Sequence, residues 1–275
     1  MLQFRRWIVI HRFLRRLLAA AAVAAIAAPV PAVAEVFGGA DRDVPLARFQ
    51  DPICPGVTGI QLDQAQEIVA VIRANAQKLG LRLADSATCQ PNVILAVMSA
   101  PRAFLEKLIT DRPYLVEDLD PGEREALLHT LGPALSWNRV EVRTRDGMMV
   151  SRHLNLDDIP VMRTQMAHSK IYRAIRRDII SAMVLVEPSA VQGLTVAQLA
   201  DYTTMRALSD DDAAQLPSVH PTILHLFDAS GDKPAGLTDA DRIFLGTLYS
   251  TQPNDPASIT LAMANDRIAK GKTGE

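Results

Sequence analysis

The residues that most often carry catalysis or bind metals are scattered in this 275-residue chain. The sequence has no H-E-x-x-H, C-x-x-C, G-x-S-x-G, Walker or G-x-G-x-x-G motif. His220 and His225 are five residues apart across Pro221 and could meet in a loop, but zinc needs about three protein ligands. We therefore expect no metal site and no other cofactor. The histidines beyond the N-terminal segment, expected on the surface or in the core, are His129, His153, His168, His220 and His225.

Nucleophiles and paired carboxylates give equally little support for catalysis. Serines such as Ser99, Ser136 and Ser181 have no base at a recognisable spacing. Acidic residues cluster at 117–120 and 210–212, where a polar context favours solvated loops or helix starts over acid–base chemistry. The catalytic residues, if the chain has any, therefore remain unknown at this level.

Cys54 and Cys89 are the two cysteines of the chain. Each lies near a proline in a loop-like context, and in an exported protein such a pair usually forms a disulfide. Two free buried thiols are the alternative. A bridge would close a loop whose entropy corresponds to roughly 3–4 kcal/mol of stability.

An export signal is predicted for residues 1–34. Five arginines precede an uncharged apolar run at Leu17–Ala28, and Ala32-Val33-Ala34 provides the small residues that a signal peptidase recognises. Cleavage is expected between Ala34 and Glu35. A retained membrane anchor is the alternative, but the apolar run is shorter than the roughly 20 residues of a spanning helix. We expect a periplasmic or secreted protein whose mature form does not span a membrane.

Cleavage would change the charge of the chain. The signal holds five of the 29 basic residues, which leaves 24 against 31 acidic residues, a net charge of about −7. Nucleic-acid binding is not expected, because phosphate contacts need clustered lysine and arginine. The one basic cluster, Arg173, Arg176 and Arg177, is interpreted as a solvated face.

Hydrophobic periodicity predicts interleaved helices and strands, hence an α+β fold with a mixed sheet packed by helices. Thr195 and Thr238 are expected as N-caps and Gly80 as a C-terminal cap. Asp146-Gly147 predicts a hairpin turn. Expected helices are Leu62–Leu79, Pro101–Ile109, Pro121–Leu131, Ile171–Arg177, Leu194–Leu208, Leu237–Tyr249 and Pro256–Ile268, and expected strands are Asn92–Met98, Asn138–Thr144 with Met148–Leu156 as its partner, and a central strand at Ile179–Val186.

The second half carries a family resemblance. A strand at Ile179–Val186, a helix at Thr195–Leu208, a short apolar stretch and then LTDADRIFLGTLY at Leu237–Tyr249 resemble the closing half of zincin-type metallopeptidases. Where that family has two histidines and a glutamate, this helix has QLADYTTMRALS. The resemblance implies a zincin-like fold without zinc ligands, in which Asp201, Tyr202 and Arg206 line the position of the lost site. A chance recurrence of the same element order is the alternative.

The whole chain also resembles uncharacterised exported proteins of Gram-negative bacteria, through RFQDPICPGVTG from Arg48 and LADYTTMRAL from Leu199.

Two functions are considered. The first is a non-catalytic binding or scaffold module of the cell envelope, with unknown partners. The second is an exported hydrolase with an unrecognised site near Asp201, Tyr202 and His225. The predicted organisation is a signal at 1–34, a lead-in at 35–58, a domain at 59–252, undivided or split into 59–135 and 136–252, and a C-terminal helix and tail at 253–275.

Overall fold

The sheet is built around its central strand, β5 (Ile175–Val186). One edge of β5 pairs antiparallel with β4 (Ala134–Thr144), and the other pairs parallel with β1 (Arg48–Phe49) and β3 (Val93–Val97). β2 (Pro55–Thr58) extends the sheet beyond β3, also in parallel. The mostly parallel sheet and its helices confirm the α+β class. The computed structural model describes residues 43–117, 119, 121–149, 173–209, 220–228 and 233–271.

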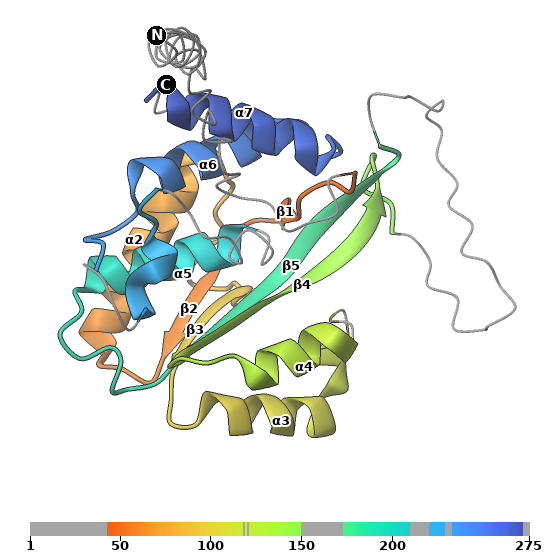
Figure 1. Cartoon of the computed structure of the whole chain (residues 1–275). Helices are drawn as coiled ribbons and strands as arrows, with labels where there is room; N and C mark the ends of the chain where they lie inside the picture. The colour runs from red at the N-terminus through yellow and green to blue at the C-terminus, as the bar shows by residue number, and fades with distance from the viewer. Residues whose placement is uncertain are drawn as a thin grey trace, which may run out of the picture. The chain divides into compact units, whose positions relative to one another are not determined.

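Helices cover both faces of this sheet (Figure 1). The α-helices are α2 (Leu62–Lys78), α3 (Pro101–Asp111), α4 (Pro121–His129), α5 (Val196–Leu208), α6 (Asp239–Ser250) and α7 (Ala257–Ala269), and the 3-10 helices are η1 (Pro113–Leu115) and η3 (Ile223–Phe227). α2, α5, α6 and α7 lie on one face with the larger hydrophobic cluster, and α3 and α4 lie on the other with a smaller one. Trp137 and Leu185 belong to the smaller cluster.

A β-bulge in β5 decides which side chains reach each cluster. Arg139 pairs with Ser181 and Val140 pairs with Ile179, so Ile180 is an extra residue without a partner across the ladder. An extra residue reverses the alternation of faces along the strand. This reversal explains why Ile179 joins the same core cluster as Ala182, although the two are three positions apart.

The spacing of apolar residues in α2 predicted both the helix and its buried face. Ile68, Ile72 and Ala76 recur every four residues and are fully buried. Gly80 adopts a φ of +74°, as expected of a C-terminal cap. Its N–H donates to the carbonyl oxygen of Gln77, and the next N–H donates to that of Ala76, which is the pattern of a Schellman motif.

The two predicted threonine N-caps are confirmed. Thr195 forms a capping box with Gln198 at the start of α5, and Thr238 forms one with Asp241 at the start of α6. In each case the threonine hydroxyl accepts from a backbone N–H of the first turn, and the partner side chain accepts from the threonine N–H.

One predicted element was wrong where the structure describes it. The expected helix at Ile171–Arg177 is instead the beginning of β5 from Ile175 onward, because these residues pair with β4. The expected hairpin partner of β4 begins as predicted, because the Thr144 N–H donates to the Met148 carbonyl at 2.8 Å and Met149 forms an antiparallel bridge to Arg143. β4 also pairs along its whole length with β5, which the sequence did not predict. The turn itself is present, and Gly147 has a φ of +87°.

Residues 43–58 of the predicted lead-in segment contribute β1 and β2 to the sheet. β3 and β5, which come from the two predicted subdomains, pair with each other and share the larger core. Outside the described residues lie the signal and its Ala34–Glu35 cleavage position, the rest of the predicted Met148–Leu156 strand beyond Met149, the acidic run at 210–212, and His153 and His168.

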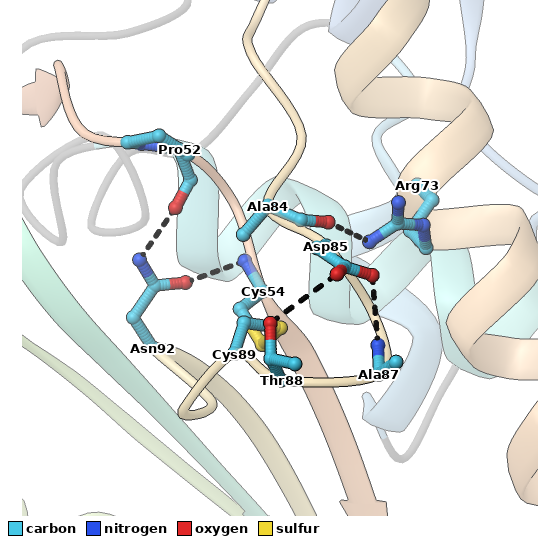
Figure 2. The surroundings of a disulfide bond; sticks show 9 residues. All are labelled: Pro52, Cys54, Arg73, Ala84, Asp85, Ala87, Thr88, Cys89 and Asn92. Atoms are coloured by element: carbon cyan, nitrogen blue, oxygen red, sulfur yellow. Dashed lines mark hydrogen bonds between the residues drawn. A yellow bond between two sulfur atoms is a disulfide. The ribbon is translucent and has the colours of Figure 1, made fainter.

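The predicted Cys54–Cys89 disulfide is confirmed (Figure 2). The sulfur atoms are 2.04 Å apart and the Cα atoms 6.2 Å apart. The bridge links the residue before β2 to the loop that leads into β3. Asn92 supports the same junction, because its Oδ1 accepts from the Cys54 N–H at 2.8 Å and its Nδ2 donates to the Pro52 carbonyl at 2.9 Å.

Candidate functional site

Asp201 on α5 is buried between α2 and the segment that precedes α6. One carboxyl oxygen accepts from Nδ2 of Asn75 at 2.7 Å, and the other accepts from the backbone N–H of Leu237 at 2.7 Å. Nδ2 of Asn75 also donates to Oγ1 of Thr204 at 3.2 Å. An unpaired buried polar group costs about 1–3 kcal/mol, so these bonds make Asp201 a connection between three segments of the fold.

Gly236 allows this connection to form. A Cβ atom at this position would lie 2.5 Å from Oδ2 of Asp201, which is closer than real Cβ contacts come. The absence of a side chain therefore lets the backbone approach the carboxyl group closely enough for Leu237 to donate its N–H. Neither Asn75 nor Gly236 carried a sequence signal of this role.

Tyr202 and Arg206, one helical turn apart on α5, contact each other. Nε of Arg206 donates to the Tyr202 hydroxyl at 3.2 Å, and the guanidinium carbon is 5.5 Å from the centroid of the tyrosine ring. The ring is buried and meets Phe227 of η3 edge-on, with centroids 4.8 Å apart. Tyr202 thus packs η3 against α5.

His225 is half-buried on η3. Within the described part of the chain, the side-chain hydrogen bonds of Asp201 and Tyr202 go to other residues, so neither is bonded to His225. No group of three or more histidine, cysteine or acidic residues suited to a metal ion occurs among the described residues. His220, the other member of the considered metal pair, has interactions of its own.

The carboxyl group of Asp241 anchors the start of α6 to η3. It accepts from the Thr222 hydroxyl at 2.5 Å and from the N–H groups of Ile223 and Thr238 at 2.8 and 2.9 Å. The residue is completely buried. Burial raises the pKa of Asp241 above the ordinary carboxyl value, although the surrounding donors act in the opposite direction.

A cavity of about 200 Å³ lies between the C-terminal end of α2 and α6. Its lining residues are Asn75, Lys78, Leu79, Leu237, Arg242, Leu245 and Gly246. Two of these, Asn75 and Leu237, are the residues that Asp201 holds by hydrogen bonds. Asp201, a residue of the sequence-predicted site, does not itself line the cavity. It positions two of the residues that do.

Lys78 and Arg242 supply the charge of the cavity. Both side chains are exposed, and within the described residues neither forms an ion pair or a side-chain hydrogen bond. By contrast, two members of the predicted basic cluster are paired, Arg173 with Asp43 at 2.6 Å and Arg176 with Asp178 at 3.0 Å. Unlike these two arginines, the two cations at the cavity have no acidic partner among the described residues.

Gly246 lies in the interior of α6 and faces open space. An added Cβ would meet no atom within 4 Å, and its φ is not in the left-handed region. Glycine inside a helix costs roughly 0.5–1 kcal/mol relative to alanine, so neither packing nor backbone geometry accounts for it. Because Gly246 has no side chain, it leaves space in the wall of the cavity. The sequence analysis did not single out Gly246, although a glycine inside the predicted helix Leu237–Tyr249 is a signal that could have drawn attention to this site.

Comparison with known proteins gives no significant match to a family model, a curated protein sequence or a solved structure. No helix in the described ranges combines the length and the apolar character needed to cross a membrane.

Proposed function

We propose that this protein is an exported, non-catalytic binding module that holds a small ligand in the cavity between α2 and α6. The observation that carries the proposal is the lining of that cavity: apolar side chains of Leu79, Leu237 and Leu245 beside two cations without ion-pair partners. Ligand sites in proteins typically combine a mostly apolar surface with a few placed polar groups. Among the described residues, those that line the cavity include no histidine, cysteine, serine or acidic side chain, which favours binding over acid–base catalysis.

Export is supported by the disulfide and by the sequence of residues 1–34. Disulfides persist in oxidising compartments such as the periplasm. The test is to express the full chain in a Gram-negative host and to determine the N-terminus of the protein recovered from the periplasm. A start at Glu35 is expected. A protein that keeps residues 1–34 would contradict a cleaved signal.

A zincin-like origin is retained as part of the proposal. The strand β5, the helix α5, η3 and α6 follow one another in the order that the resemblance implies. Asp201 and Tyr202, at the position of the lost zinc site, serve the packing of α5 against α2 and η3. Because these two side chains are engaged in packing, they favour a zincin-like fold with a binding role over the alternative of a hydrolase.

The binding role is tested with a library of small metabolites and the purified protein. At least one compound should raise the melting temperature of the wild-type protein but not that of Gly246→Leu, whose side chain enters the cavity. The compound should be recovered unchanged after incubation. A library without such a compound, or a compound that is hydrolysed by the protein, would overturn the proposal.

A further inference from the structure

The geometry points to a specific ligand class for this cavity: a small α-carboxylate that carries an amide N–H and an apolar side chain, as in an N-acylated leucine. The inference rests on the proposed function and deepens it. A free acyl amino acid and the C-terminal residue of a peptide share this chemistry, and the test separates them. Each of the three parts of the ligand follows from a different part of the lining.

The carboxylate follows from Lys78 and Arg242. Two cations border one cavity, and within the described residues neither has an acidic partner. A guanidinium matches a carboxylate with two parallel hydrogen bonds, and an ammonium contributes a point charge.

The amide N–H follows from Asn75. Its side-chain nitrogen must be the atom that faces Asp201, because the carboxyl group accepts the hydrogen bond. Both N–H protons of that nitrogen are engaged, one by Asp201 and one by Thr204. The side-chain oxygen is the remaining polar atom of Asn75, and it can only accept. A ligand that contacts this wall residue through its side chain must therefore bring a donor.

The apolar side chain and the small size follow from the remaining lining. Leu79, Leu237 and Leu245 offer apolar surface, and Gly246 leaves space beside them. The volume of about 200 Å³ is below the roughly 300–1,000 Å³ of pockets that enclose drug-sized ligands. One aliphatic side chain with its α-carboxylate suits this space better than a long acyl chain.

The test is calorimetric titration with N-acetyl-leucine and three analogues that each lack one part. N-acetyl-leucinamide lacks the charge, 4-methylpentanoate lacks the amide, and N-acetylglycine lacks the side chain. Removal of the charge or of the side chain should weaken binding about tenfold or more, and removal of the N–H about threefold. A peptide ending in Ala-Ala-Leu should bind at least as well as N-acetyl-leucine if the natural ligand is a peptide C-terminus, and more weakly if it is a free acyl amino acid.

Matched variants locate the binding. Lys78→Gln and Arg242→Gln should each weaken N-acetyl-leucine about tenfold and leave the neutral amide unchanged. Lys107→Gln is the control, because Lys107 is exposed on α3 on the opposite face of the sheet. Equal binding of the acid and the amide, unchanged binding in both cavity variants, or no binding of N-acetyl-leucine would overturn the inference. The proposed function would survive these results if another compound still distinguished the wild type from Gly246→Leu.

Discussion

Nδ2 of Asn75 lies 2.7 Å from a carboxyl oxygen of Asp201, so two residues 126 positions apart are joined directly behind the candidate ligand site. The same carboxyl group holds the backbone N–H of Leu237. Asn75 comes from α2 and Leu237 from the start of the α6 segment, and the cavity lies between these two helices. The geometry of the cavity therefore depends on a side chain that does not line it.

Asp201→Asn should destabilise the fold by about 1–3 kcal/mol. An asparagine can accept with one oxygen only, so either Asn75 or Leu237 would face a second donor and lose its partner. Urea denaturation measures the change. Asp111→Asn, at the exposed end of α3, is the matched control and should change stability by less than about 0.5 kcal/mol. An equal effect of the two substitutions would contradict the role assigned to Asp201.

Two glycine substitutions should have opposite signs. Gly236→Ala places a Cβ against Oδ2 of Asp201 and should cost about 1–3 kcal/mol. Gly246→Ala meets nothing and removes a helix-interior glycine, so it should stabilise the protein by about 0.5–1 kcal/mol. Thermal unfolding of both variants checks the pair. A destabilising Gly246→Ala would show that this glycine serves packing instead of leaving room for a ligand.

The buried carboxyl group of Asp241 should make stability depend on pH. Its pKa in the folded protein is raised above the ordinary value of 3.8, so between these two values the folded state binds more protons than the unfolded state. The stabilising contribution is present below the ordinary value and is lost as the pH rises through the folded pKa. Asp241→Asn lacks this titration.

Urea denaturation of the wild type and Asp241→Asn, repeated at several pH values from acidic to neutral, tests this prediction. The free energy of unfolding of the wild type should fall relative to that of the variant as the pH rises. A relative gain of the wild type would mean that the three donors to Asp241 outweigh its burial.

Removal of the disulfide should cost about 3–4 kcal/mol, because Cys54 and Cys89 are 35 residues apart and their link restricts the unfolded chain. The double substitution Cys54→Ser/Cys89→Ser and the reduced wild type should lose similar amounts in denaturant titrations. Stability that is insensitive to reductant would contradict the contribution assigned to this bridge.

Local patterns predicted the parts of the fold that depend on neighbouring residues. Thr195 and Thr238 were identifiable as caps because a capping box is complete within four residues. Gly80 was identifiable because a helix that ends in a Schellman motif favours glycine there. The disulfide could be inferred because the chain has two cysteines and a predicted export signal.

Relationships across long separations were not predictable in this way. The alternation of β4 indicated a strand, but nothing local indicated that Val140 pairs with Ile179 past a bulge. Likewise Lys78 and Arg242 are ordinary exposed residues in sequence, and they border one cavity only because α2 and α6 pack on the same face of the sheet. Asp201 was predicted to line the position of a site, and the structure places it behind the cavity wall, where it holds Asn75 and Leu237.

Chemical-shift mapping by NMR tests the central claim most directly. N-acetyl-leucine is titrated into isotopically labelled protein, and the backbone amide shifts are followed at increasing ligand concentration. Saturable changes are predicted at the cavity, at Lys78, Leu245 and Gly246, with none on α3. Changes that do not saturate, or that cluster away from α2 and α6, would contradict the assignment of this cavity as the binding site.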